Sequence, residues 1–297
     1  MVILFLLKNI FYIELKRKEE LGLKIIVCIK QVPDTTSVKM NPETNTLIRD
    51  GVVSIINPFD TYAIEEGVRL NEKYGGEIIA LSMGPPQVEE SLRDALSLGV
   101  NNAYLLTDIA FAGADTLATG YTLAAGIKKL GGADIIILGR QAMDGDTGQV
   151  GPSVSENLGI PHITNVRKIE QIDEDGIIIV ERLLEGGYLR LKTKLPVLIT
   201  VVKEINEPRL PTIKAKMLAR KKEIVSWDSN NLDIETERIG LTGSPTQVIK
   251  IFTPPKTTKG KIYQGNVKTS VTSFLKDIQN AGIQFIKKED RMKNGTN

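Results

Sequence analysis

Short runs of consecutive apolar residues recur along the first two thirds of the chain, and amphipathic segments separate them. Such a run, bounded by turn residues, is typical of a strand buried on both faces of a parallel sheet. The runs predict strands at 24–29, 77–82, 102–106, 134–138 and 195–202. The segments between them predict helices at 58–74, 87–98, 115–130 and 150–158. Alternation of strands and helices over short connections favours an α/β fold with a doubly wound, mainly parallel sheet.

Two hairpins are predicted outside this alternation. The runs 46–49 and 52–55 flank Asp50-Gly51, a preferred two-residue turn. The runs 176–180 and 188–193 lie on either side of Gly186-Gly187 and predict an antiparallel hairpin.

Hydrophobic periodicity is lost after Asn206. Proline and glycine clusters punctuate the segment that follows, and a C-terminal helix is predicted only at about 270–281. A long irregular segment in an otherwise compact protein usually wraps around a partner, so we expect an arm that extends from the domain. The chain then divides into an extension (1–23), an α/β domain (24–205) and a docking and wrapping region (206–297).

The first 23 residues do not fit the domain pattern. The apolar run 2–13 is interrupted by Lys8 and is shorter than the roughly 20 residues of a membrane span. The basic cluster 16–18 follows the apolar run, whereas a signal peptide carries its positive charge before it. We expect an accessory segment with no part in the chemistry and no stable membrane span.

Composition excludes several functional classes. The 297 residues hold 38 Lys and Arg against 36 Asp and Glu, a net charge of +2 that does not indicate nucleic-acid binding. The chain has one cysteine, Cys28, and one histidine, His162, so no intramolecular disulfide, thiolate zinc cluster or multi-histidine metal site is expected. A reducing cytoplasm is the expected location.

Ligands of open parallel sheets bind at the carboxyl ends of the strands, so the connections there are the candidate site. Three have unusual composition: 57–60, 83–85 and 139–152. The third leads directly into a helix, and its glycines at 145, 148 and 151 free the backbone to approach a ligand. Free N–H groups and the helix dipole there suit a pyrophosphate.

Other features of this glycine loop leave its role open. Thr147 and Gln149 add hydrogen-bonding side chains, whereas Asp144 and Asp146 would repel phosphate unless they cap the turn or reach ribose hydroxyls. A glycine-rich connection without a ligand is the alternative. Neither the dinucleotide-binding fingerprint G-x-G-x-x-G nor the P-loop G-x-x-x-x-G-K-[ST] occurs.

Five motifs in this order resemble the beta subunit of electron-transfer flavoproteins. They are KIIVCIKQVPDT (24–35), INPFD (56–60), LSMGP (81–85), GRQAMDGDTGQVGP (139–152) and NEPRLPTIKAKMLARKKE (206–223). The resemblance extends from Lys24 to the C-terminal helix. It implies an adenine-nucleotide-hydrolase-like (Rossmann-like) domain and an arm that embraces an alpha subunit in a heterodimer.

The resemblance also implies a nucleotide site. Housekeeping members hold a structural AMP in this domain while the alpha subunit holds FAD, and electron-bifurcating members hold a second FAD that faces NADH. Carried over by position, the cofactor contacts are Cys28, Asn57, Pro58, Phe59, Asp60, Met83, Ala142, Met143, Asp144, Gly145, Asp146, Thr147, Gly148, Gln149, Val150, Gly151, Pro152 and Ser153.

Two stretches favour the bifurcating branch. ADTLAT (114–119) resembles a signature of bifurcating members and adds Thr116 and Thr119 to the expected flavin site, and DGDTGQVGP also follows that pattern. The resemblance then implies electrons from NADH delivered to ferredoxin or flavodoxin and, through the alpha-subunit FAD, to an acyl-CoA or related dehydrogenase, within a complex and not by a stand-alone enzyme. A housekeeping subunit with AMP, or a non-redox adenine-nucleotide module, is the alternative.

Three further residues have modest expected roles. Ile213 occupies the apolar anchor position of the family's dehydrogenase-docking loop, beside a Lys/Arg cluster at 214–222. Cys28 is expected to be a small core side chain that lines the adenine site, and His162 a loop residue.

Overall fold

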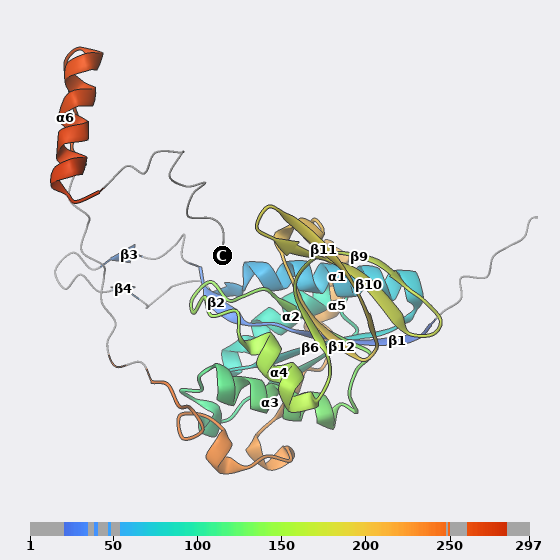
Figure 1. Ribbon diagram of the computed structural model, residues 1–297. Helices are drawn as coiled ribbons and strands as arrows, with labels where there is room; N and C mark the ends of the chain where they lie inside the picture. The colour runs from blue at the N-terminus through green and yellow to red at the C-terminus, as the bar shows by residue number, and fades with distance from the viewer. Residues whose placement is uncertain are drawn as a thin grey trace, which may run out of the picture. The chain divides into compact units, whose positions relative to one another are not determined.

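A computed structural model of the chain describes residues 21–34, 39–40, 47–48, 54–247, 249 and 260–283 (Figure 1). Two compact units divide the chain, one at 1–251 and the other at 252–297. The expected extension lies almost wholly outside the described residues. No helix in the described part of the chain is long and apolar enough to cross a membrane.

The first unit is built on a nine-stranded sheet of order β11-β10-β9-β12-β8-β1-β6-β7-β13. Its parallel part comprises β1 (Leu23–Cys28), β6 (Gly76–Met83), β7 (Asn102–Leu106), β8 (Ile135–Gly139), β12 (Val197–Val201) and β13 (Val225–Trp227). The antiparallel part comprises β9 (His162–Ile172), β10 (Ile177–Leu184) and β11 (Gly187–Lys194), and β9 joins it to β12 in parallel. The predicted doubly wound, mainly parallel α/β fold is confirmed.

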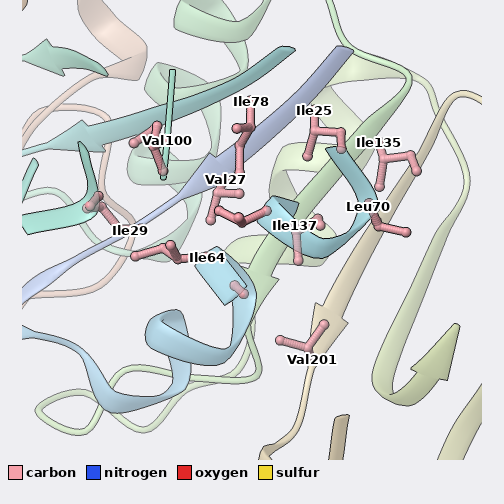
Figure 2. Packing of buried hydrophobic residues seen from close by; sticks show 14 of the residues in the cluster. Ile25, Val27, Ile29, Ile64, Leu70, Ile78, Val100, Ile135, Ile137 and Val201 are labelled. Carbon is pink, nitrogen blue, oxygen red and sulfur yellow. The ribbon is translucent and has the colours of Figure 1, made fainter. Parts of the chain in front are cut away.

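Helices cover both faces of this sheet because the side chains of each central strand alternate between two apolar cores. On one face Ile25 and Val27 of β1 pack with Ile64 and Leu70 of α1 (Pro58–Tyr74) (Figure 2). The same face carries α2 (Glu89–Ser97) and α5 (Ile213–Lys221). On the opposite face Ile26 and Cys28 pack beneath α3 (Thr116–Lys129) and α4 (Val150–Leu158) (Figure 1).

The sheet itself differs from expectation at its ends. β9 and β13 were not expected, and β1 begins at Leu23, a buried residue that the predicted boundary assigned to the extension. His162 is accordingly the first residue of a strand and not a loop residue. The hairpin predicted at 176–193 is confirmed as β10 and β11.

The hairpin predicted at 46–55 is wrong. Leu47–Ile48 pairs with Lys39–Met40, and Ser54–Ile56 pairs with Gln31–Pro33, so the two predicted strands have different partners. Both pairings are antiparallel and lie outside the large sheet. Asp50 and Gly51 lie outside the described residues.

The irregular segment after Asn206 is not a free arm over 206–247. Val225–Trp227 extends the sheet beside β7, and Ala219, Leu232 and Ile239 are buried. Single buried side chains and a three-residue strand give no periodicity, which explains why the sequence predicted an arm. The partner-docking role of this segment stays a prediction.

The second unit contains α6 (Val267–Asn280), which begins three residues before the predicted position. Asn266 caps it by accepting a hydrogen bond from the Thr269 amide at 2.9 Å. Tyr263 packs edge-on against Phe274, and its hydroxyl donates to Asp277 at 2.6 Å. No residue of α6 is buried.

Candidate functional site

The site predicted at the carboxyl edge of the sheet is held together by a buried carboxyl group. Asp60, in the first turn of α1, accepts hydrogen bonds from the Lys30 amide just past β1 (2.8 Å) and from the Gly139 amide at the end of β8 (3.1 Å). A Cβ atom on Gly139 would lie 2.4 Å from the Asp60 carboxylate, so only glycine fits there. Asp60 therefore fixes two neighbouring strand ends relative to α1.

Burial changes the acid strength of this carboxyl group. Asp60 is only 5% exposed, and burial raises its pKa to about 7, against the opposing effect of the backbone hydrogen bonds that it accepts. A group with this pKa changes its charge near neutral pH. The sequence pointed to Asp60 as a cofactor contact, but its carboxylate is occupied by the protein's own backbone.

Asn57 clamps the start of the glycine loop. Its side-chain amide donates to the carbonyl of Gln141 at 2.9 Å and accepts from the amide of Met143 at 3.1 Å. The residue is 1% exposed and makes no side-chain cap to α1, although it stands at the N-cap position. The two contacts bind the end of the β1–α1 connection to the loop that follows β8.

The two aspartates of the glycine loop are engaged within the protein. Asp144 forms an ion pair with Lys30 at 2.7 Å, and Asp146 accepts from the side chain of Gln141. Asp146 has a left-handed backbone (φ +52°), and its amide bonds to the carbonyl of Ala142 at 2.8 Å. Each carboxylate binds a side chain and not a backbone amide of the turn in the described part of the chain. The turn cap considered for these aspartates is therefore not seen there, and their contact with ribose stays a prediction. Lys30 and Gln141 were not among the predicted site residues.

The three glycines of this loop differ in role. Gly148 has φ +62°, a conformation that favours glycine, and a Cβ atom on Gly145 would meet nothing within 4 Å. A Cβ atom on Gly151 would lie 2.6 Å from the Thr200 side chain of β12. Close helix-to-sheet packing therefore requires glycine at position 151, and the free backbone expected there for a ligand stays a prediction.

The N-terminus of α4 has no side-chain cap. Gln149 stands at the N-cap without a capping hydrogen bond, the first turn holds no acidic residue, and Pro152 has no N–H. The amides of Val150 and Gly151 thus lie at the positive end of the helix dipole with no side-chain partner among the described residues. This is the arrangement that an anion would complete.

The hydroxyl of Ser153 adds an unused polar group to the same turn. It is buried and has no hydrogen-bond partner within the described part of the chain. A Cβ atom on Gly120 of α3 would lie 2.1 Å from this hydroxyl oxygen, so α3 and α4 approach closely there (Figure 1). This unpartnered buried hydroxyl beside the uncapped helix turn is a polar group that a bound phosphate would satisfy.

The N-terminus of α3 is different, because it is already capped. The Asp115 carboxylate accepts from the amides of Leu117 (2.9 Å) and Ala118 (3.1 Å). A phosphate group at this turn would face a carboxylate. Thr116 and Thr119 are partly exposed in the first turn, so their hydroxyl groups, and not the helix terminus, are the groups left for a ligand.

Three predicted contacts meet in one apolar cluster beneath the loop. Cys28 is buried at the end of β1, and Met83 and Val150 pack against the same cluster partly buried. Burial, with a smaller effect of the neighbouring Asp60, raises the pKa of the Cys28 thiol well above its usual range. The thiol therefore stays protonated and serves as a small core side chain, as the sequence indicated.

Ile213 lies apart from these residues, at the start of α5. Its side chain is 82% exposed, and Thr212 caps the helix by accepting from the Ala215 amide at 3.1 Å. Leu210, Met217 and Leu218 are also exposed. We refer to Leu210, Ile213, Met217 and Leu218 as the docking face.

Fold and site together define a Rossmann-like α/β protein whose candidate ligand site lies at the carboxyl ends of β1 and β8. Comparison with known proteins identifies the family. Residues 44–232 match the family described as "Electron transfer flavoprotein domain". This chain belongs to the electron transfer flavoprotein family.

Relatives specify the subunit. The chain is 49% identical over 262 residues to the electron transfer flavoprotein subunit beta of Thermoanaerobacterium thermosaccharolyticum. This match covers 88% of the present chain and 100% of the relative. It is 47% identical over 258 residues to the same subunit of Clostridium acetobutylicum (86% and 98% covered). It is 45% identical over 254 residues to the caffeyl-CoA reductase-Etf complex subunit CarD of Acetobacterium woodii (85% and 96% covered). The resemblance to beta subunits is confirmed.

Proposed function

We propose that the carboxyl edge of the sheet binds FAD and that this flavin takes electrons from NADH in a complex with an electron transfer flavoprotein alpha subunit. The uncapped N-terminus of α4 carries the proposal, together with the unpartnered hydroxyl of Ser153. The similarity to CarD, which is named as a subunit of a caffeyl-CoA reductase-Etf complex, supports the bifurcating branch over the housekeeping one.

The protein's part in this function is to bind and orient. The amides of Val150 and Gly151 would hold the pyrophosphate, and the Ser153 hydroxyl would donate to it. Asn57 and Asp60 hold the loop and strand ends that surround the cofactor, and Cys28 and Met83 form an apolar floor. FAD supplies the redox chemistry, since it accepts a hydride and releases electrons one at a time.

Two further partners follow from the proposal. The docking face would bind an acyl-CoA or related dehydrogenase, with Ile213 as the anchor residue, and the complex would then pass electrons to that dehydrogenase. Ferredoxin or flavodoxin would receive the low-potential electrons. AMP in place of FAD would use the same phosphate contacts but would leave this chain without a redox group.

Counting the cofactors separates these functions. The chain is co-expressed with its alpha subunit, the purified heterodimer is denatured, and released FAD and AMP are quantified by chromatography. Two FAD per heterodimer is the expected result. One FAD and one AMP would replace the proposal with the housekeeping function, and one FAD without AMP would show that the glycine loop is a connection without a ligand.

A further inference from the structure

The helix α5 buries almost none of its apolar surface against its own domain. It has nine residues, of which only Ala219 is buried, and its larger apolar side chains lie on the exposed docking face. Helices shorter than about 12 residues are marginal in water on their own. Hydrophobic burial therefore does not explain how this helix is held in place.

Hydrogen bonds from one arginine hold the carboxyl end of the helix. Nη1 of Arg93 donates to the carbonyl oxygens of Ala219 (3.1 Å), Arg220 (3.1 Å) and Lys222 (3.2 Å). The last carbonyl groups of a helix lack partners within the helix, and a cation there also complements the helix dipole. Arg93 thus acts as a charged cap supplied by another helix.

The cap is attached to a rigid part of the domain. Arg93 belongs to α2, whose Leu92 and Ala95 are fully buried against the sheet. Its Nη2 forms an ion pair with Glu89, one turn earlier on α2, which orients the guanidinium group. Arg93 therefore links the α5 carboxyl end to α2, while the side chain of Lys222 donates to the carbonyl of Asn101 beside it.

A second arginine fixes the chain just before α5. Arg209 forms ion pairs with Glu65 (2.8 Å) and Glu72 (2.6 Å) of α1, and its amide donates to Glu65 at 3.1 Å. Glu65 is 3% exposed, so this attachment is partly buried. Both ends of α5 are thus held by polar contacts, and these contacts leave the docking face uncovered.

We propose that Arg93 is a positioning residue for electron delivery, because it holds α5 by its carboxyl end and so presents the docking face to the partner dehydrogenase in a fixed orientation. The inference rests on the docking function proposed above. The partner that fits is one with an apolar pocket and an acidic rim, since Lys214, Lys216, Arg220 and Lys221 belong to the same helix as Ile213, Met217 and Leu218.

Hydrogen exchange tests the cap in the heterodimer with alpha. In Arg93→Met, the amides of α5 should exchange at least about tenfold faster than in the wild type, as expected when hydrogen bonds to a charged donor are lost. Amides of β1 and β8 should be unchanged. Glu89→Gln, which keeps the carbonyl contacts, should have a much smaller effect, and Arg93→Lys should restore part of the protection. Wild-type exchange in Arg93→Met would overturn the proposal.

Kinetics test the consequence for docking. The probe is a purified acyl-CoA dehydrogenase, chosen from a panel because the wild-type complex reduces it with saturable kinetics when NADH is the donor. Arg93→Met should raise the apparent KM for the complex severalfold and leave kcat and flavin content nearly unchanged, with rescue by Arg93→Lys. Arg190→Met is the matched control, because its guanidinium pairs with Glu170 and does not contact α5.

Ile213→Ala in the same assay separates the two levels of the argument. If Ile213→Ala raises KM and Arg93→Met does not, the positioning role is wrong while the docking role stands. If Ile213→Ala leaves KM unchanged, the docking role itself is wrong, and the exchange experiment then judges only whether Arg93 caps the helix.

Discussion

Asp60 gives the domain a pH dependence that can be assigned to one residue. Its pKa is raised by burial to about 7, so the folded protein holds a proton that the unfolded chain has already released. Between about pH 4 and pH 7, this group lowers the free energy of unfolding by up to about 1.4 kcal/mol for each unit of rising pH. Asp60→Asn, which cannot ionise, should remove this slope.

Urea unfolding of the wild type and Asp60→Asn at several pH values measures this effect. As pH rises through this window, the free energy of unfolding of the wild type should fall relative to that of Asp60→Asn. Glu170→Gln is a control of opposite sign, since a hydrogen bond from Arg190 lowers the pKa of Glu170 and its contribution is lost as pH falls. Parallel pH profiles for the wild type and Asp60→Asn would contradict the assignment.

Gly148 tests the glycine loop as a cofactor cradle. Gly148→Val should lose the nucleotide of this subunit and keep the alpha-subunit flavin, because a β-branched side chain disfavours φ +62° and obstructs the approach of a ligand to the backbone. Gly159→Val is a matched control, since Gly159 has φ +67° at the other end of α4 with open space around it. Full cofactor content in Gly148→Val would exclude this loop as the cradle.

The sequence predicted which segments meet at the site better than it predicted the roles of their side chains. Asn57 and Asp60 lie at the carboxyl edge, where both bind the protein's own backbone, and their contact with a cofactor stays a prediction. Residue type and order do not give the direction of a side chain, which depends on packing between segments distant in sequence. Lys30 was missed because its partner, Asp144, is distant along the chain.

At the scale of elements, β13 decides whether residues 206–247 belong to the domain. Trp227, the one tryptophan of the sequence, stacks against Tyr104 of β7 at 4.8 Å, and Lys129 lies 5.1 Å from its ring centre. A strand packed in this way should unfold with the sheet.

Fluorescence of Trp227 reports on β13, and far-UV circular dichroism reports on the whole unit. We expect coincident urea transitions for the two signals in the isolated subunit. A fluorescence transition at lower urea would show that β13 separates on its own, as a free arm would. Near-UV circular dichroism, to which the Tyr104–Trp227 pair contributes, provides a second local signal.

The elements differ in how well the sequence predicts them, for a physical reason. The central parallel strands are buried on both faces and read as unbroken apolar runs, so β6, β7 and β8 were found within one or two residues. β9 mixes apolar and charged residues because part of it is solvent-exposed, and β13 is only three residues long. Neither produces a periodic signal above that of a loop.

At the scale of the whole molecule, α6 is a candidate surface for a partner, because it exposes several large apolar side chains and buries none of its residues. Val271, Phe274 and Leu275 are each at least 40% exposed, and Ile283 is 55% exposed. Full burial of an exposed side chain of this kind gains roughly 1.5–3 kcal/mol, so covering the half that is still exposed gains about half of that for each. We therefore expect proteases to cleave the isolated subunit within 260–283 and to spare this region when the alpha subunit is present.

Limited proteolysis with mass spectrometry, with and without alpha, checks this expectation. Residues 206–247 should resist cleavage in both samples because they pack on the sheet. Phe274→Ser combined with Leu275→Ser should weaken protection by alpha, whereas Lys268→Ser, on the same helix, should not. Equal resistance of 260–283 with and without alpha would show that this region needs no partner.

The accessory role of the first residues is tested by deletions that end before or after the first residues that contact the folded domain. The amide of Gly22 donates to the carbonyl of Tyr74 at 3.1 Å, and Leu23 is buried as the first residue of β1, so a deletion that spares the fold extends no further than residues 1–20.

We therefore expect the chain without residues 1–20 to form the heterodimer with unchanged flavin content and thermal stability. A chain without residues 1–24 is the control, because it also loses Leu23 and the first pairs between β1 and β6. Removing a buried leucine costs about 2–5 kcal/mol, so this control should unfold several degrees lower. Size-exclusion chromatography, flavin absorbance and thermal melts compare the two. If the chain without residues 1–20 already fails to form a soluble heterodimer, the first 20 residues have a part in assembly.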